Sequence, residues 1–302
     1  MVERDKVVAT VIDPSTDLPS SGNNQKEVLS RFTVICPGGG LQAMSSMHMD
    51  HMVTKGLPFL SRIRFTNGQE CYDSSGNFTA NSTYGRNRDL IFSLLASDVT
   101  TNGGFYNVSI GQDPDKVYAI ALCRGDVNSS SESDCASCIN SGIQDIMSKC
   151  PNQKQALSWG SAGLLPCIVH YASNPFFGRM ELDPFNSGYN TGDIRSNINL
   201  TKFDEIWESL MVRVVTKTSH GSSRLKFGIG EANVTLFQKI YALMQCTPDL
   251  SQQVCEYCLY QSLSYFQTCC YGKQGGYVLR PSCFLRWDLY PFYTLPIAET
   301  PL

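Results

Sequence analysis

Cysteine spacing constrains the fold of this chain more than any other feature of its sequence. Five cysteines recur, in the same order, about 120 residues further along. In the first copy they are Cys123, Cys135, Cys138, Cys150 and Cys167, and in the second they are Cys246, Cys255, Cys258, Cys270 and Cys283. Both copies keep the spacing Cys-x2-Cys-x11-Cys. Because self-similarity at a fixed period indicates a duplicated structural unit, the sequence predicts two related domains.

Residues around the cysteines place the domain boundaries. The apolar stretch 117–123 matches the stretch 240–246. We therefore expect one domain over residues 68–180 and a second over residues 196–293. The stretch 181–195 between them is rich in Asp, Asn and Gly, which favour turns, and it is interpreted as a linker.

Two terminal segments fit neither unit. Residues 1–67 are expected to form a poorly ordered N-terminal extension. Residues 294–302 are expected to form a short C-terminal tail. The extension contains His48-Met-Asp-His51, the best local candidate for a metal site, although a histidine pair in a tail is the commoner explanation.

Hydrophobic periodicity gives both units a similar order of elements. In the first unit it predicts helices over 86–96 and 134–147 and strands over 105–110, 117–122, 156–159 and 165–171. In the second it predicts helices over 203–215 and 252–266 and strands over 225–229, 240–245 and 277–289. Leu90, Ile91, Leu94 and Leu95 are expected to share one helical face, and Ser133 or Asp134 to cap the second helix. This order indicates an α+β fold of two tandem, disulfide-stapled domains, each with two helices on an antiparallel β-sheet.

Charge and hydropathy exclude two classes of protein. The chain has 24 basic against 27 acidic side chains, a net charge of -3, so it lacks the excess of positive charge that binds phosphate backbones. We expect no nucleic-acid partner. No apolar run approaches the roughly 18 to 20 residues needed to cross a bilayer, so no transmembrane span is expected in this chain.

The 13 cysteines are open to two chemical interpretations. Each Cys-x2-Cys pair lies on a predicted helix, where residues three apart are neighbours, so each could begin a zinc site. No histidine recurs between the copies, and further cysteines would be left over, so an intracellular zinc or redox protein is the less favoured alternative. That alternative draws support from residues 1–20, which lack the apolar core of a secretory signal.

Six N-glycosylation sequons favour disulfides in an oxidising compartment. Their acceptor residues are Asn77, Asn81, Asn107, Asn128, Asn199 and Asn233. We therefore expect the protein in the extracellular space or at the outer face of the plasma membrane.

These residues resemble a known family. Cys246-x8-Cys-x2-Cys258, Cys270-Tyr-Gly-Lys-Gln-Gly-Gly and Arg280-Pro-Ser-Cys-Phe-Leu-Arg-Trp-Asp are similar to the ginkbilobin-homologous cysteine-rich domain of land plants. A tandem of such domains resembles the ectodomain of plant cysteine-rich receptor-like kinases and of related secreted proteins. The resemblance covers about residues 68–293. The first copy departs from it by three extra residues between Cys123 and Cys135.

The resemblance implies a disulfide pairing that spacing alone leaves open. It pairs Cys71 with Cys150, Cys123 with Cys135, Cys138 with Cys167, Cys246 with Cys255, and Cys258 with Cys283. No cysteine corresponding to Cys71 opens the second copy, so Cys269 and Cys270 either bond to each other or remain free. Cys36 makes the total odd.

The resemblance also implies a function. It indicates a non-catalytic recognition module in plant stress or defence signalling, with a glycan, an extracellular protein or a co-receptor as partner. The alternative is a secreted antifungal lectin-like protein. The mannose-binding positions of the family fall here on Tyr72, Ser161 and Ala172 in the first copy and on Tyr277 and Asp288 in the second. Only Asp288 keeps a group of the right chemistry, a carboxylate that accepts hydrogen bonds from hydroxyls.

Catalytic and cofactor motifs are not found, so we predict no enzymatic activity, no cofactor and no metal. His170 lies beside Cys167 on a predicted strand and is interpreted as structural. Gly228-Ile-Gly230 is half of a dinucleotide fingerprint and is interpreted as a bulge or a close approach of a strand. Arg124-Gly-Asp126 spells an adhesion tripeptide but is interpreted as a turn.

Overall fold

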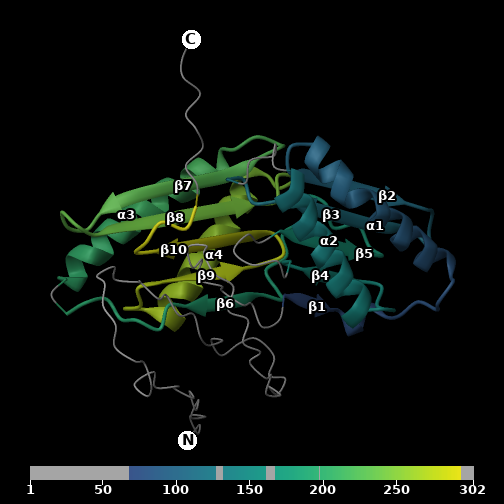
Figure 1. Ribbon diagram of the computed structural model, residues 1–302, viewed down its shortest axis with the longest axis horizontal. Coiled ribbons are helices and arrows are strands. Elements are labelled where there is room, and N and C mark those ends of the chain that lie inside the picture. The colour runs from purple at the N-terminus through teal and green to yellow at the C-terminus, as the bar shows by residue number, and fades with distance from the viewer. Residues whose placement is uncertain (1–67, 127–131, 161–166, 197, 294–302) are drawn as a thin grey trace, which may run out of the picture.

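The computed structural model describes residues 68–126, 132–160, 167–196 and 198–293. Two units lie one after the other along the long axis of the molecule (Figure 1). Each unit has two helices and a five-stranded antiparallel sheet, which confirms the predicted α+β class. The N-terminal extension, the C-terminal tail and with them Cys36, His48 and His51 lie outside the described residues.

The first unit begins with a short strand and a 3-10 turn, Asp73–Ser75. Its strands are β1 (Gln69–Cys71), β2 (Phe105–Ile110), β3 (Val117–Leu122), β4 (Ala156–Ser158) and β5 (Ile168–Ala172). Its helices are α1 (Thr83–Thr101) and α2 (Glu132–Lys149). The strand order β1-β4-β5-β3-β2 puts the cysteine-flanked strands β3 and β5 side by side in the middle of the sheet.

The second unit repeats this arrangement. Its strands are β6 (Asn186–Tyr189), β7 (Lys226–Asn233), β8 (Lys239–Cys246), β9 (Gly275–Leu279) and β10 (Cys283–Asp288). Its helices are α3 (Leu200–Ser219) and α4 (Gln252–Cys270). The strand order β6-β9-β10-β8-β7 is that of the first sheet, element by element.

Helix α1 corrects one prediction about its buried face. Ile91 and Leu95 are fully buried, but Leu90 and Leu94 are 50% and 38% exposed. Arg88, Phe92 and Val99 are also buried, so the buried face of α1 follows the 3.6-residue period of the helix. Leu90 and Leu94 lie at the edge of that face. Helix α2 begins at Glu132, so Ser133 and Asp134 lie within it and neither is its N-cap.

Two strands replace the single one predicted over 277–289. Pro281 has no backbone N–H to give to a strand ladder, and Arg280 donates its own N–H to the Cys283 carbonyl at 2.9 Å, which closes a tight turn. The chain therefore folds back, and β9 pairs with β10.

The stretch predicted as a linker contains strand β6. This strand pairs with β9 in register from Asn186 opposite Leu279 to Tyr189 opposite Gly276. Gly188 allows the approach, because a Cβ there would lie 2.8 Å from the Tyr277 ring. The turn-forming residues flank a short edge strand, so the second unit begins before residue 196.

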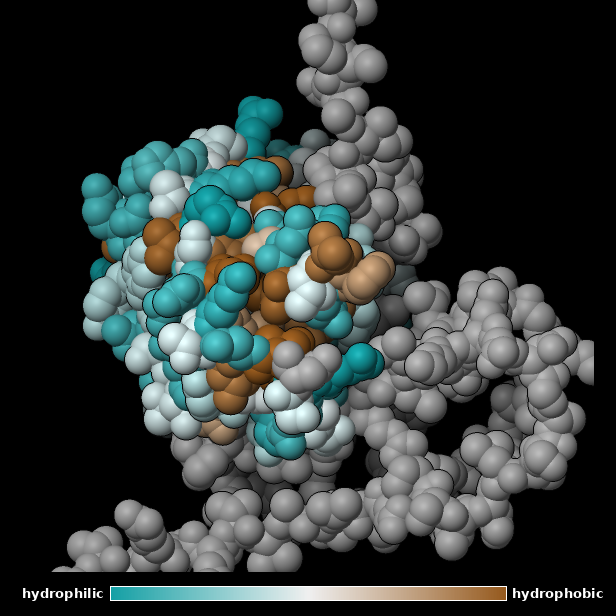
Figure 2. All heavy atoms as spheres, turned by 90° about the vertical axis from the view of Figure 1, so that its left-hand side faces the viewer, coloured by the Kyte–Doolittle hydropathy of each residue, from teal (hydrophilic) through white to brown (hydrophobic). Residues whose placement is uncertain are grey.

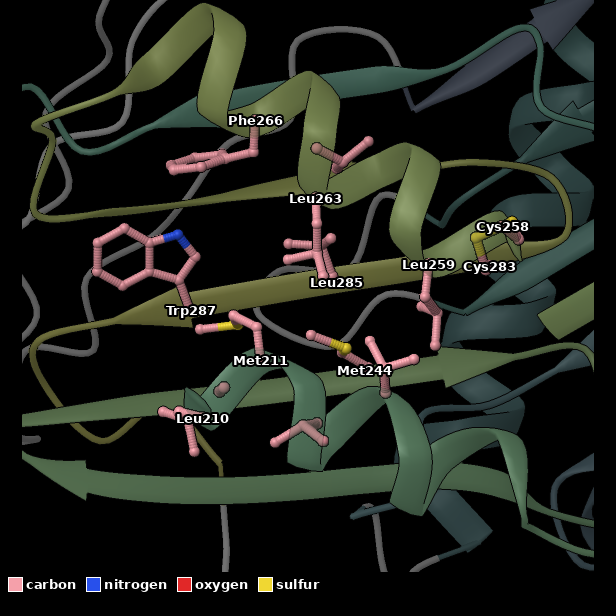
Figure 3. Packing of buried hydrophobic residues seen from close by; sticks show 14 of the residues in the cluster. Leu210, Met211, Met244, Cys258, Leu259, Leu263, Phe266, Cys283, Leu285 and Trp287 are labelled. Carbon is pink, nitrogen blue, oxygen red and sulfur yellow. A yellow bond between two sulfur atoms is a disulfide. The ribbon is translucent and has the colours of Figure 1, made fainter. Parts of the chain in front are cut away.

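Each sheet packs one face against its own two helices. In the second unit this core includes Met211 of α3, Leu259 and Phe266 of α4, and Leu285 and Trp287 of β10, which point toward one another in Figure 3. In the first unit the corresponding core contains Ile91, Leu95, Ile139 and Val169. Gly228 allows helix α3 to lie very close to β7, since a Cβ at this position would be only 2.4 Å from the Thr218 hydroxyl. Strand β7 keeps an unbroken register with β8, so the glycines mark a close approach and not a bulge.

A third apolar cluster joins the two units. It combines Trp159 and Ile168, on the sheet face of the first unit that points away from its helices, with Leu243, Leu279 and Phe284 of the second. All five side chains are at most 3% exposed. Burial of this kind stabilises by roughly 1.5 to 3 kcal/mol for each large side chain, so the units are held together as one body.

Candidate functional site

Polar contacts surround the apolar junction between the units. The Gly125 N–H donates to Gln245 Oε1 at 3.0 Å, and Gln245 Nε2 donates to the Cys123 carbonyl at 3.0 Å. Arg124 donates to Asp126 Oδ2 at 2.7 Å, and both side chains are buried. The Arg-Gly-Asp tripeptide therefore lies inside the junction, where it cannot present itself to an adhesion receptor.

A small recess opens between residues of the two units. We call it the junction recess and define it by six of its lining residues, which are His170, Phe176, Arg179, Glu181, Asp249 and Ser282. His170 lies on β5, and Phe176, Arg179 and Glu181 lie in the segment that follows β5. Asp249 precedes α4, and Ser282 lies in the turn between β9 and β10. Both units therefore supply residues that line the recess.

Backbone N–H groups hold the Asp249 carboxylate and the main chain at Glu181 in place. The Gly178 N–H donates to Asp249 Oδ2 at 2.7 Å, and the Glu181 N–H donates to the Ser282 hydroxyl at 2.8 Å. The remaining oxygens, Asp249 Oδ1 and Glu181 Oε2, are shielded from solvent and accept no hydrogen bond within the described part of the chain. Buried acceptors without a donor are costly, and here two of them line one recess.

The histidine of the recess is neutral. His170 is 1% exposed and lies between the rings of Phe176 and Tyr72, at centroid distances of 4.3 and 5.9 Å. Burial lowers its pKa to about 3. Its Nε2 atom lies 3.8 Å from Glu181 Oε2, beyond hydrogen-bond distance. Burial raises the pKa of Glu181 above its ordinary value. The recess therefore offers hydrogen-bond acceptors, and its lining combines two carboxyl groups with one guanidinium, that of Arg179.

The described cysteines are all bridged. The pairs are Cys71–Cys150, Cys123–Cys135, Cys138–Cys167, Cys246–Cys255, Cys258–Cys283 and Cys269–Cys270. Cys138–Cys167 and Cys258–Cys283 each tie the helix that follows the third strand of a unit to the last strand of its sheet. The structure thus joins Cys269 to its sequence neighbour, one of the two possibilities that the sequence left open.

Five of the six sequons lie among the described residues. Asn77, Asn81, Asn107, Asn199 and Asn233 are all exposed. Asn199 also caps α3, since its side-chain oxygen accepts from the Lys202 N–H at 3.1 Å. Asn128 lies outside the described residues. Exposure is compatible with glycosylation, which stays a prediction.

The positions expected to contact mannose are not arranged as a sugar site. Asp288 is fully buried, its Oδ2 accepts from Arg286 at 3.3 Å, and its Oδ1 accepts from the Leu289 N–H at 3.2 Å. Ala172 and Tyr277 are 3% and 8% exposed, and Ser161 lies outside the described residues. Asp288 is therefore corrected from a candidate sugar ligand to a buried structural carboxylate.

Sequence reasoning missed the junction recess. Arg179, Glu181 and Asp249 belong to no motif, and two of them fall at the edge of the supposed linker. The one available signal was the buried strand position of His170, which was interpreted as structural.

Comparison with known proteins identifies the family. A model of the salt stress response/antifungal domain matches residues 70–174 and again residues 190–290. The chain belongs to the salt stress response/antifungal family. It is 45% identical over 243 residues to cysteine-rich receptor-like protein kinase 11 of Arabidopsis thaliana, which covers 77% of this chain and 36% of the kinase. It is 44% identical over 225 residues to cysteine-rich receptor-like protein kinase 14 of the same plant, covering 74% of this chain and 33% of the kinase.

This family member thus spans about a third of the length of those kinases. Two solved structures share its fold, the tandem DUF26 ectodomains of the Arabidopsis thaliana cysteine-rich receptor-like proteins PDLP8 and PDLP5. The TM-scores are 0.61 and 0.55 at 20% and 21% identity, and the matches cover 74% of this chain and 97% and 98% of those chains. The tandem ectodomain architecture indicated by the sequence is confirmed.

Two general features complete the description. None of the helices within the described ranges is both long and apolar enough to span a membrane. Within those same ranges, no three His, Cys, Asp or Glu side chains come together as metal ligands.

Proposed function

We propose that this chain is the extracellular recognition module of a cysteine-rich receptor-like kinase or of a secreted relative, and that it acts in stress or defence signalling without catalysing a reaction. Family membership and the ectodomain fold support an extracellular module. The apolar junction between the two units supports a single rigid binding surface over two domains that move independently.

One observation carries the mode of recognition. The junction recess holds two shielded carboxylate oxygens, on Glu181 and Asp249, that accept no hydrogen bond from the described residues. The two carboxyl groups outnumber Arg179, the one guanidinium in this lining. A partner that brings a cationic donor, such as the ammonium or guanidinium group of a peptide, would supply hydrogen bonds to these oxygens. We therefore propose a peptide or protein ligand with a basic group that enters the recess.

Binding of synthetic peptides to the secreted protein tests this proposal. A panel of peptides would carry Lys or Arg in one arm and norleucine or citrulline in the other, with mannose oligosaccharides as a third arm. We expect the basic peptides to bind, and the charge-removing substitutions Glu181→Gln and Asp249→Asn to weaken binding at least tenfold. Glu205→Gln, the same change at an exposed site on α3, is the matched control and should leave affinity unchanged.

Two results would contradict the recess as the site. Equal affinity for charged and uncharged peptides would remove the role of the carboxylates. Binding of mannose oligosaccharides alone would favour the lectin-like alternative through a different surface.

A further inference from the structure

The turn between β7 and β8 exposes two large apolar side chains almost completely. Leu236 is 95% and Phe237 is 96% exposed, well above the 62% of Tyr271, the next most exposed large apolar or aromatic residue of the described chain. The turn lies at the left-hand end of the molecule in Figure 1, the end that faces the viewer in Figure 2, where hydrophobic residues lie among hydrophilic ones. Two adjacent apolar side chains at a hairpin tip leave apolar surface in water, and a group that covered them would remove that surface from water.

Hydrogen bonds hold this tip in a defined turn. The Val234 N–H donates to the Gln238 carbonyl at 2.8 Å. The Thr235 hydroxyl accepts from the backbone N–H groups of Phe237 at 3.2 Å and Gln238 at 3.0 Å. The tip is therefore ordered by its own backbone while Leu236 and Phe237 remain outside any core cluster.

The same tip carries a glycosylation sequon, Asn233-Val-Thr235. Asn233 is exposed and pairs with Lys239 across the hairpin, so the two side chains emerge on one face. Phe237 lies in the short turn that joins Asn233, the last residue of β7, to Lys239, the first residue of β8, and the hydrogen bond between Val234 and Gln238 draws the two ends of this turn together. A sugar on Asn233 would start within reach of this aromatic ring.

We propose that the first N-acetylglucosamine of a glycan on Asn233 packs its apolar face on Phe237 and covers the hairpin tip. The Asn233 amide nitrogen forms a bond to C1 of that sugar, the bond from C1 to the diphosphate of a lipid-linked oligosaccharide donor breaks, and the amide proton is released. Once attached, the sugar meets the ring at a high effective concentration, so even a weak stacking contact is populated. The inference requires passage through the secretory pathway and is independent of the junction recess.

Asn107 offers a matched comparison. It is also an exposed sequon asparagine on an edge strand, β2, and its neighbours Phe105, Tyr106 and Val108 are all partly buried. A glycan there has no fully exposed ring beside it. Removing the glycan at Asn107 shows the general effect of losing a sugar, and removing the glycan at Asn233 also removes any contact with Phe237.

Hydrogen exchange of protein secreted from a glycosylating host, together with peptide mass spectrometry, tests the proposal. We expect Asn233 to be glycosylated and the amides of residues 234–238 to exchange several-fold more slowly than in Asn233→Gln. Phe237→Ala should lose the same protection, the double variant should lose no more, and Asn107→Gln should change nothing at this tip. Trimming the glycan to its first sugar with an endoglycosidase should keep the protection, because only that sugar touches the ring.

Three results would overturn the proposal. The first is an unmodified Asn233 in secreted protein. The second is additive loss in the double variant, which would mean that sugar and ring act separately. The third is loss of protection on trimming, which would assign the effect to the outer sugars. None of these results bears on peptide binding at the recess, so the two proposals fail separately.

Discussion

At the scale of single residues, Asp288 shows how burial changes the meaning of a side chain. The sequence places a carboxylate where the resemblance expects a sugar ligand, and the structure places it inside the second unit. Burial raises its pKa to about 7, although the charge and hydrogen bond of Arg286 and the hydrogen bond of Tyr290 oppose that shift. A motif gives the type of residue at a position. Whether that residue is exposed depends on how β10 packs in the fold, and a single position in the sequence does not reveal this.

Replacing Asp288 should change how stability depends on pH. The folded pKa of about 7 lies above the ordinary 3.8, so the folded state holds its proton more tightly, and the resulting stabilisation is complete below about pH 4 and lost as the pH rises to 7. Asp288→Asn cannot titrate. The stability advantage of the natural protein over this variant should therefore shrink by up to about 1.4 kcal/mol per pH unit between pH 4 and 7.

Urea unfolding of both proteins at several pH values measures this difference. Asp193→Asn, the same substitution at an exposed carboxylate paired with Lys273, is the control for removing a carboxylate at the surface. A constant difference from pH 4 to pH 8 would contradict a raised pKa at Asp288.

At the scale of elements, periodicity predicted the strands better than the helix ends. Strands over 105–110 and 117–122 lie where expected, because each is a short apolar run with glycine or proline turns beside it. Helix α1 extends to Thr83 and Thr101, beyond the predicted 86–96, because Ser82 caps it and tertiary packing covers its polar first turn. Strand β6 was missed because a strand of four residues among turn formers is stabilised by its partner β9 and not by its own sequence.

Gly228→Ala should separate helix α3 from strand β7. The added methyl group would lie 2.4 Å from the Thr218 hydroxyl and 3.1 Å from the Val214 carbonyl oxygen, and backbone atoms cannot move aside easily. Overpacking of this kind costs about 1 to 3 kcal/mol. Thermal unfolding followed by circular dichroism should show a lower Tm. Gly272→Ala is a comparison without overpacking, because open space surrounds Gly272 and its loss comes only from the strain of a positive φ of 81°. An unchanged Tm in Gly228→Ala would contradict the close approach.

At the scale of the whole molecule, the duplication was readable from cysteine spacing, but the junction was not. Its apolar residues alternate with core residues on the same strands, so each strand looks continuously buried, and nothing in the sequence says which face meets the other unit. Phe284 faces the first unit, whereas its neighbour Leu285 faces the helices of the second. The junction recess depends on this docking, so it could not be predicted before the docking was seen.

These two neighbours provide a test of rigidity. The natural protein should melt in one calorimetric transition, because the junction couples the units. Phe284→Ala removes a buried ring at a cost of about 3 to 5 kcal/mol and should split the transition in two. Leu285→Ala, at about 2 to 5 kcal/mol, should lower the Tm and keep the units coupled. Two transitions in the natural protein would show that the units unfold independently.

The positions of the disulfides set the order in which this protein can be oxidised as it emerges from the ribosome. Cys71 is the first of the bridged cysteines to emerge, but its partner Cys150 follows 79 residues later, after three other thiols that belong to different pairs. In the second unit no bridge spans more than 25 residues. The first half must therefore avoid or correct wrong pairings, whereas the second can close its bridges among near neighbours.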